Sequence, residues 1–483
     1  MIDRTEYPPV YTGFMVNWLL CSSLVLLSSA GDPVRQQEAI TSLLEATELE
    51  RKTVRSFVHG ESWTHRAMGA LRLCKYECEQ ADTLVMQLLD DRDWHVRCFA
   101  VLAMARRGME PPAGFLMEEE EPRVVRTALR CGYGFPKERI QHGIEGLYKY
   151  GSLDLKLLGA EIALASGIEQ LQPDAEKTIR TVILRMDDAE AGGLSPRLAA
   201  VTSGNDVRRA FRWRHWAKRN RGDMGLDPAH LANPETPGSP TWIESLDEEA
   251  FSSLHEYMEQ LEDRYVDLGI CLDCTASMSG ELAQAQGGID DLMSFIGDVT
   301  AGIRIAVVAY RDNKDTFKTK GWDFTSSISQ ARSWLWTLSA EGGGDRPEAV
   351  ADAMRLACGK LSWNRGNSMT LIIIGDAPPK VGTGSHCVRM ARQAAEHDLH
   401  THVISCTRAS GEQSGDDEVP GLPVASKAEG RVEFFHEIAE AGGGRCVQLG
   451  DNALIGEITG LTLGDLFRRE IDEFFNLWQM LCR

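Results

Sequence analysis

The stretch that decides the fold is VDLGICLDCTASMSG, residues 266–280. Its largely apolar first half ends in Asp273, which is followed at every second position by Thr275 and Ser277. Alternate residues of an extended chain project to the same side. One carboxylate and two hydroxyls at a strand-to-helix turn are hard oxygen donors of the kind that Mg²⁺ prefers. The pattern predicts a cation site; the alternative is a helix cap, in which Ser277 caps the helix and the other two side chains bond to backbone groups.

Acids also occur at the ends of later apolar segments. Asp312 and Asp376 each follow such a segment, and ligands of open α/β sheets bind at the carboxyl ends of the strands. Between them, the glycine-rich segment GGGDRPE at residues 342–348 carries Asp345 just before a predicted helix. We expect Asp312 to brace its own loop through backbone hydrogen bonds. We expect Glu348 to act as a first-turn acid on the helix dipole.

Taken in order, the motifs DxTxS, YRD, GGGDxPE and DAPP resemble those of a von Willebrand factor A domain, over roughly residues 260–460. The resemblance is closest to the branch found in bacterial proteins and in the atypical alpha-kinases. It implies a metal-ion-dependent adhesion site that binds Mg²⁺ (or Mn²⁺ or Ca²⁺). The ligands that it implies are Asp273, Thr275, Ser277, Asp345 and Asp376, the last often acting through water.

One of these ligands departs from the family pattern. The middle ligand of the family is commonly a threonine, and the aligned residue here is Asp345. A second carboxylate beside the cation would make it less electrophilic. We therefore expect the affinity or ligand preference of this site to differ from that of its relatives.

The second half of the chain, residues 245–483, alternates between predicted strands and helices. The predicted strands are residues 265–272, 303–310, 370–375, 401–405 and 446–449. The predicted helices are residues 280–297, 326–338, 347–361, 387–397 and 432–441, and an amphipathic helix at 463–481 that completes the outer layer of the sheet or docks onto the first half. Continuous apolar strands joined by helices predict a doubly wound, mostly parallel sheet.

The first half, residues 35–221, is predicted to be all helix. Basic residues recur at Arg66, Arg97, Arg126 and Lys156, with spacings of 31, 29 and 30, and small residues follow each of them. A period near thirty resembles HEAT-type repeats, and the alternative is an irregular helical bundle. Residues 222–244 form a proline-rich linker. The predicted fold class is therefore α + α/β, with a helical-repeat region followed by a von Willebrand factor A domain.

The first residues, 1–34, form a possible signal or anchor segment. Residues 14–30 are apolar and end in Ser28-Ser29-Ala30, which is similar to a signal-peptidase site. We expect an exported (periplasmic) or membrane-associated protein; the alternative is a buried N-terminal helix in a cytoplasmic protein. The formal net charge of −20 argues against non-specific nucleic-acid binding.

Three functions remain in view. The first is a non-catalytic scaffold, whose cation takes up an acidic side chain of a protein partner and whose helical repeats add a second surface. The second is a phosphotransferase with Asp273 as its nucleophile, but that chemistry needs a second acid two residues later, where this chain has Thr275. The third is a structural protein with a metal-free domain. No Walker loop, Ser-His-Asp spacing or zinc-protease motif supports an enzyme.

Overall fold

A computed structural model of the protein describes residues 58–204, 209–226, 242–312, 315–343, 347–406, 432–448, 454–464 and 466–482. The chain divides into two compact units. The helical unit comprises residues 1–175, 228–258 and 476–483, and the sheet unit comprises residues 176–227 and 259–475. The predicted signal or anchor segment, residues 1–34, lies outside the described residues. Among the helices that are described, none is both long enough and apolar enough to cross a membrane.

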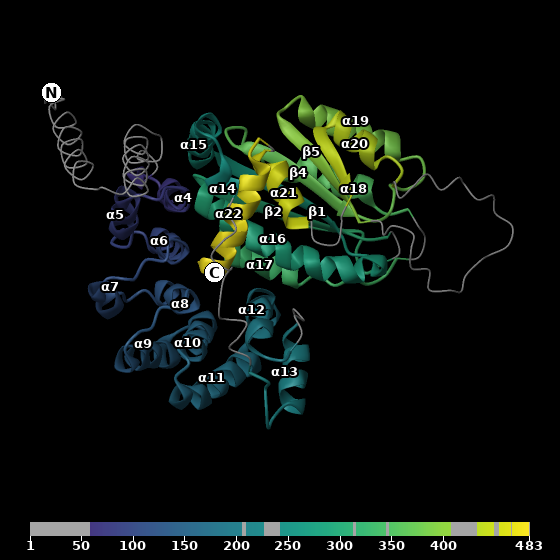
Figure 1. The fold of residues 1–483 in the computed structure, drawn as a ribbon. Helices are drawn as coiled ribbons and strands as arrows, with labels where there is room; N and C mark the ends of the chain where they lie inside the picture. The colour runs from purple at the N-terminus through teal and green to yellow at the C-terminus, as the bar shows by residue number, and fades with distance from the viewer. Residues whose placement is uncertain are drawn as a thin grey trace, which may run out of the picture. The chain divides into compact units, whose positions relative to one another are not determined.

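The described residues of the helical unit form helices joined by loops (Figure 1). The helices are α4 (Trp63–Leu73), α5 (Glu79–Leu88), α6 (Trp94–Arg106), α7 (Ala113–Glu118), α8 (Pro122–Arg130), α9 (Lys137–Tyr150), α10 (Leu153–Ala165), η1 (Glu169–Leu171), the start of α11 (Gln172–Arg185), α14 (Trp242–Ser245) and most of α15 (Glu248–Glu262). Alternate helices α4, α6, α8 and α10 contact one another in this order. The predicted helices are thus confirmed over residues 58–175, and every second helix there belongs to one row; residues 35–57 of the predicted region lie outside the described residues, and residues 176–221 belong to the sheet unit.

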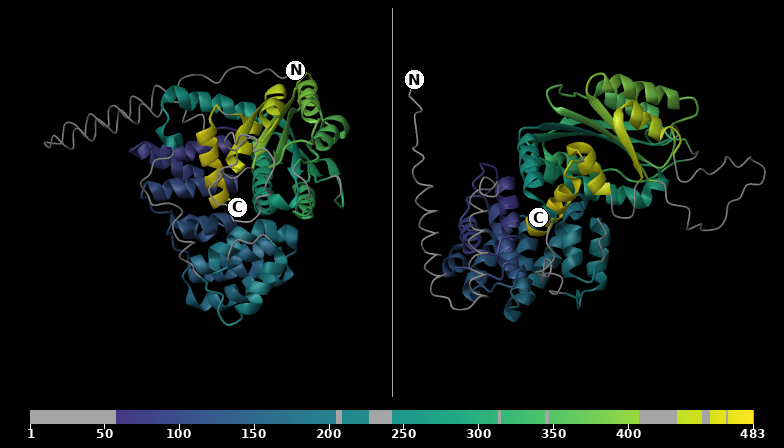
Figure 2. Two further views of the ribbon diagram at one scale, coloured as in Figure 1. Left: turned by 90° about the vertical axis from the view of Figure 1, so that its right-hand side faces the viewer. Right: turned by 45° about the horizontal axis from the view of Figure 1, so that its top comes forward.

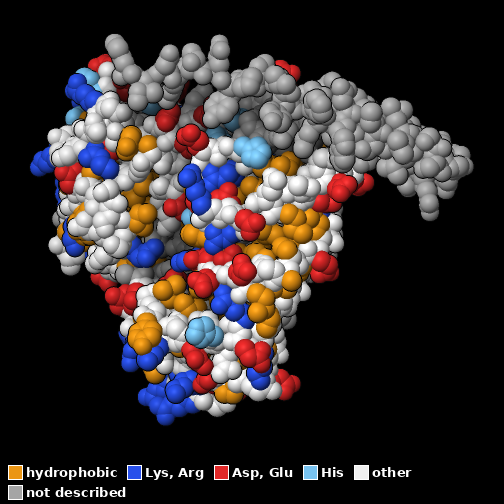
Figure 3. Space-filling model, turned by 90° about the vertical axis from the view of Figure 1, so that its left-hand side faces the viewer, with side chains coloured by type: hydrophobic (Ala, Val, Ile, Leu, Met, Phe, Trp, Pro, Cys, Tyr) orange, Lys and Arg blue, Asp and Glu red, His pale blue; other side chains and the backbone are white. Residues whose placement is uncertain are grey.

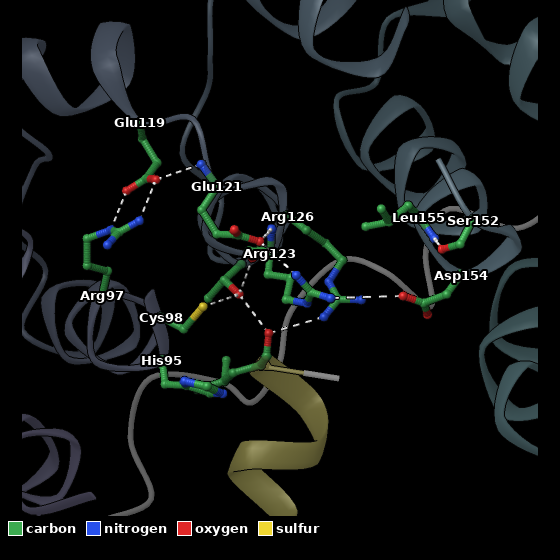
Figure 4. A network of polar contacts seen from close by, with 12 residues as sticks. His95, Arg97, Cys98, Glu119, Glu121, Arg123, Arg126, Ser152, Asp154 and Leu155 are labelled. Atoms are coloured by element: carbon green, nitrogen blue, oxygen red, sulfur yellow. Dashed lines mark hydrogen bonds and ion pairs between the residues drawn. The ribbon is translucent and has the colours of Figure 1, made fainter. Parts of the chain in front are cut away.

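Three of the four basic residues of the thirty-residue period connect successive helices of this row, and Figure 4 shows one of these contacts, Arg97 with Glu119. The three arginines each pair with an acid that precedes, or lies in, the next helix of the row. The pairs are Arg66 with Asp91 at 2.6 Å, Arg97 with Glu119 at 2.8 Å and Arg126 with Glu161 at 2.9 Å. The period in the sequence therefore corresponds to a repeated contact between helices.

The sheet unit contains one six-stranded sheet in the order β3-β2-β1-β4-β5-β6. Its strands are β1 (Tyr265–Asp273), β2 (Gly302–Tyr310), β3 (Thr319–Thr325), β4 (Ser368–Gly375), β5 (Leu399–Ser405) and β6 (Gly443–Gln448). All neighbouring strands are parallel except β3, which runs antiparallel to β2. The doubly wound, mostly parallel sheet is confirmed, with one edge strand that the sequence did not predict.

Helices cover both faces of this sheet (Figures 1 and 2). On one face lie α18 (Val350–Lys360), α19 (Gly384–Ala395) and α20 (Phe435–Ala441), and on the other lie α16 (Ser279–Val299), α17 (Ile328–Trp336) and α21 (Leu454–Leu463). Two further helices, α12 (Asp188–Val201) and α13 (Ala210–Arg219), belong to this unit, and α12 contacts α16 and α17. The central strands are buried on both faces, which explains their continuous apolar sequences.

The last helix, α22 (Arg468–Leu481), begins in the sheet unit and ends in the helical unit. In its first half, Phe474 and Phe475 pack against Phe295 of α16, with ring centroids 6.2 and 5.0 Å away. In its last turn, the backbone carbonyls of Met480 and Leu481 accept hydrogen bonds from α8. Both roles that the sequence offered for this helix are therefore present, one in each half.

Candidate metal centre

The candidate site begins where β1 ends. Asp273 is the last residue of β1 and lies opposite Tyr310 of β2, so it reaches the carboxyl edge of the sheet. Its side chain is buried, and Oδ1 accepts hydrogen bonds from the backbone N–H of Thr275 at 2.9 Å and from Thr275 Oγ1 at 2.7 Å. The other oxygen, Oδ2, is buried and has no hydrogen-bond partner among the described residues.

The oxygen side chains continue from Asp273 toward the surface. Thr275 Oγ1 lies 3.1 Å from Ser277 Oγ, and Ser277 Oγ donates a hydrogen bond to Asp376 Oδ1 at 3.1 Å. Asp376 directly follows β4, the neighbour of β1. Thr275 is buried, Asp376 is half-buried and Ser277 is exposed, so the chain of donors leads from the interior to solvent. The structure brings together four of the five ligands that the resemblance implied.

The fifth, Asp345, lies outside the described residues, but the glycine-rich loop before it is placed. Gly342 and Gly343 have φ angles of 79° and 82°, the left-handed backbone expected of this segment. The loop is held to the first one because Glu341 N–H donates to the Cys274 carbonyl at 3.1 Å and Ala276 N–H donates to the Gly342 carbonyl at 3.2 Å. A Cβ atom on Gly343 would stand 3.3 Å from Cβ of Thr275. The described part of this loop, up to Gly343, therefore lies directly beside Thr275.

Two acids after β2, Asp312 and Asp315, lie beside the site and have different partners. The carboxylate of Asp312 forms a buried ion pair with Lys380. Bracing of backbone groups falls to Asp315, whose Oδ2 accepts from Asp312 N–H at 3.1 Å and from Gly343 N–H at 3.0 Å. No local pattern singles out Asp315, because its role depends on a loop that approaches from elsewhere in the chain.

Glu348 also has a position that the sequence did not reveal. Helix α18 begins at Val350, so Glu348 precedes the helix instead of lying in its first turn. Its backbone pairs with the segment after β4: Glu348 N–H donates to the Pro378 carbonyl at 2.9 Å and its carbonyl accepts from Lys380 N–H at 3.1 Å. Its side chain is buried, and Oε2 has no hydrogen-bond partner among the described residues.

The electrostatics of the site favour a positive ion. Burial, followed by the negative charge of Asp376, raises the pKa of Asp273 to about 7, although the hydrogen bonds from Thr275 act in the opposite direction. Burial, together with the negative charges of Asp273 and Asp312, raises the pKa of Glu348 to about 8. Two adjacent buried carboxyls that resist ionisation would be stabilised in their charged form by a divalent cation.

The donor set fits a hard divalent cation. It combines carboxylate and hydroxyl oxygens, and it includes a buried carboxylate oxygen with no partner among the described residues. Within the described residues, no three His, Cys, Asp or Glu side chains converge in a way that could hold a metal ion by themselves. The hydroxyls of Thr275 and Ser277 add oxygen donors beside the carboxylates of Asp273 and Asp376.

Comparison with known proteins agrees with this geometry. Residues 267–451 match the family model described as the von Willebrand factor A domain. The chain is 33% identical over 115 residues to the ariadne-like RING finger protein R811 of Acanthamoeba polyphaga mimivirus, a match that covers 24% of this chain and only 11% of that protein.

Three solved structures are also similar. BatB from Bacteroides thetaiotaomicron has 19% identity and a TM-score of 0.31, and the match covers 44% of this chain and 99% of BatB. An aerotolerance-related membrane protein from Bacteroides fragilis has 18% identity and a TM-score of 0.30, covering 41% of this chain and 98% of that one. The SpRpn10 VWA domain has 12% identity and a TM-score of 0.30, and the match covers 42% of this chain and 96% of that domain.

Proposed function

Because residues 267–451 form a von Willebrand factor A domain, we propose that the protein is a non-catalytic interaction module that captures partners through a divalent cation. Asp273, Thr275, Ser277 and Asp376 would hold Mg²⁺, Mn²⁺ or Ca²⁺, together with Asp345. The observation that carries this proposal is the hydrogen-bonded chain from Asp273 Oδ1 to Asp376, beside which the other carboxylate oxygen of Asp273, Oδ2, is buried and has no hydrogen-bond partner among the described residues. The bound cation would supply an open coordination position for an acidic side chain of a protein partner.

The residues of the site would each have a separate task. Asp273 would supply the buried negative charge, and its Oδ1 orients Thr275. Ser277 and Asp376 lie where the site meets solvent, which is where a partner could approach. This arrangement needs no nucleophile, in keeping with a domain family that commonly serves in binding.

The first test is the effect of cations on thermal stability. A ligand that binds only the folded state stabilises it by mass action, by about 2.7 kcal/mol at a hundredfold excess over its Kd. We expect Mg²⁺, Mn²⁺ or Ca²⁺ to raise the Tm of the wild type relative to EDTA, and to have no effect on Asp273→Ala. Ser277→Ala should weaken the effect, whereas Ser329→Ala, an exposed serine on α17, should leave it unchanged.

Several outcomes would decide against the proposal. If no cation shifts the Tm of the wild type, the metal-free structural protein becomes the better description. Phosphatase turnover on a generic substrate that is lost in Asp273→Ala would favour the phosphotransferase instead. A pull-down with and without EDTA tests the partner directly, since capture should depend on the cation.

The helical unit would offer a second binding surface. We propose that its row of alternate helices, connected by arginine–acid pairs, is a HEAT-like array. A pocket of about 310 Å³ lies between α8, α9 and α10, with Val125, Ile140 and Ile144 among its apolar lining residues. Figure 3 shows basic, acidic and apolar side chains interspersed over one face of the molecule. Such mixed surfaces suit contacts with proteins.

The compartment remains a separate proposal. Export or membrane attachment through residues 14–30 would place the cation site outside the cytoplasm, where Ca²⁺ is abundant. Mass spectrometry of the mature N-terminus tests it: cleavage after Ala30 supports export, and an intact segment in a cytoplasmic fraction contradicts it.

A further inference from the structure

A fifth described acid, Glu348, is built into the wall of the candidate metal centre. Only 4% of its surface is exposed, and its Oε2 atom has no hydrogen-bond partner among the described residues. Two backbone hydrogen bonds, to Pro378 and from Lys380, hold the residue on both sides. The backbone of the residue is therefore held in place, and the charge of its buried side chain must be balanced where it lies.

The Glu348 carboxylate faces the same loop as the predicted ligands. Its Oε1 atom lies 3.8 Å from the point where a Cβ atom of Gly343 would stand, and Cβ of Thr275 lies 3.3 Å from that same point. Among neighbouring charges, Asp273 has the strongest effect on the pKa of Glu348. The nearby cation Lys380 already forms an ion pair with Asp312, so Glu348 shares with Asp273 the need for another positive charge.

We infer that Glu348 is a specificity-determining residue of the cation site, whose negative charge strengthens cation binding and weakens the hold of the bound cation on an acidic partner. This inference rests on the proposed function. In this inference Glu348 acts as a neighbouring charge of the cation site. A cation beside Asp273 would favour the ionised form of both carboxyls.

The direction of the two effects follows from Coulomb's law. A negative charge a few ångströms from a divalent cation lowers the energy of the bound cation. The same charge repels a second anion that approaches the cation. Glu348 therefore acts in opposite directions on the two binding steps, which a general loosening of the site would not do.

The experiment titrates Mn²⁺ into the full chain, with water-proton relaxation as the readout. The variants are Glu348→Gln, which keeps the shape and removes the charge, and Glu348→Asp, which keeps the charge. The matched control is Asp352→Asn, an acid in the first turn of α18 that pairs with Lys318 and Arg355. We expect Glu348→Gln to bind Mn²⁺ about tenfold more weakly, Glu348→Asp to regain most of this loss, and the control to match the wild type.

The second arm titrates acetate, as a probe for an acidic side chain, into each Mn²⁺-loaded protein. When acetate displaces a water molecule bound to Mn²⁺, the enhancement of water-proton relaxation falls. We expect acetate to bind to Glu348→Gln roughly three- to tenfold more tightly than to the wild type. Thermal unfolding in EDTA checks the fold, and Glu348→Gln should be at least as stable as the wild type because a repulsion between buried acids is removed.

The outcomes separate this inference from the proposed function. If neither the wild type nor any variant binds Mn²⁺, the proposed function is wrong and the inference fails with it. If the wild type binds Mn²⁺ and Asp273→Ala does not, but Glu348→Gln matches the wild type in both titrations, only the inference is wrong. A variant that binds both Mn²⁺ and acetate more weakly would also overturn the inference, because it would indicate a structural role.

Discussion

At the scale of single residues, the loop before Asp345 requires glycine at position 342 for two reasons, its backbone conformation and the close approach of Asp315. Gly342 has a φ of 79°, and a Cβ atom there would overlap the carboxylate of Asp315. That carboxylate accepts a hydrogen bond from Gly343 N–H at 3.0 Å. Gly342 therefore allows both the left-handed backbone and the close approach of the side chain that holds the loop.

We expect Gly342→Ala to destabilise the sheet unit by about 1–3 kcal/mol, because it adds backbone strain and displaces Asp315. It should also weaken cation-dependent stabilisation, since the loop beside Thr275 would move. Gly359→Ala is the matched control: Gly359 lies in α18 and has open space around the added Cβ, so its replacement should be stabilising by about 0.5–1 kcal/mol. Chemical denaturation of both variants measures the two changes, and equal stabilities would contradict the argument.

Residue roles could be predicted from the sequence only where local geometry sets them. The spacing of Asp273, Thr275 and Ser277 was sufficient because a strand end and a turn place all three. Glu348 was assigned to a helix dipole because the predicted helix began at residue 347, whereas α18 begins at Val350. Its burial instead depends on backbone pairing with the segment after β4, about thirty residues later, which no local pattern encodes.

At the scale of elements, the parallel strands β1, β2, β4 and β5 could be predicted because their buried residues form continuous apolar segments. Strand β3 lies at the sheet edge, and its sequence TKGWDFT has no fully buried residue. Its Gly321 and Asp323 are residues that strands usually disfavour. It forms only because β2 offers a free edge, which explains why its own sequence did not indicate a strand.

The contact between α8 and α10 gives a prediction at this scale (Figure 4). Arg126 and Glu161 form an ion pair in which each side chain is 3% exposed. Arg123 of the same helix lies 4.0 Å from Asp154, and its side chain is 28% exposed. We expect Arg126→Met to lower the free energy of unfolding by about 3–5 kcal/mol, because it removes the arginine that pairs with the buried carboxylate of Glu161. Arg123→Met should cost less than about 1 kcal/mol.

Urea denaturation of the two methionine variants tests this difference. The double variant Arg126→Met with Glu161→Met should recover most of the loss, since an apolar pair of similar volume needs no ionic partner. If Arg126→Met and Arg123→Met lower the free energy of unfolding equally, the buried pair of Arg126 and Glu161 does not stabilise the protein more than the exposed contact does.

At the scale of the whole molecule, each unit is assembled from separate parts of the chain. The helical unit takes in residues 476–483, in which Leu477, Trp478 and Leu481 are buried. Arg130 Nη1 donates to the Met480 carbonyl at 2.7 Å, and Arg126 Nη2 donates to the Leu481 carbonyl at 3.1 Å. Cations at the carbonyl end of a helix are favourable, so this turn is an integral part of the helical unit.

We expect Leu481→Ala to destabilise the helical unit by about 2–5 kcal/mol, because it leaves a cavity against α8. Leu466→Ala is the matched control, since Leu466 is 74% exposed and its loss should change stability by less than about 0.5 kcal/mol. Amide hydrogen exchange in α8 localises the effect: faster exchange in Leu481→Ala alone supports the assignment. Unchanged exchange in α8 would show that this turn does not stabilise the helical unit.

The shared helix α22 also has a consequence for synthesis. Domains generally fold as units while the chain leaves the ribosome, at about 5–20 residues per second. Helices α4 to α10 are made early, but the turn that covers Arg126 and Arg130 arrives only with residues 476–482. At these rates the helical unit waits on the order of tens of seconds, with part of its apolar surface open, until the sheet unit has been translated. During that interval a nascent chain has an uncovered surface on α8 that a chaperone could bind.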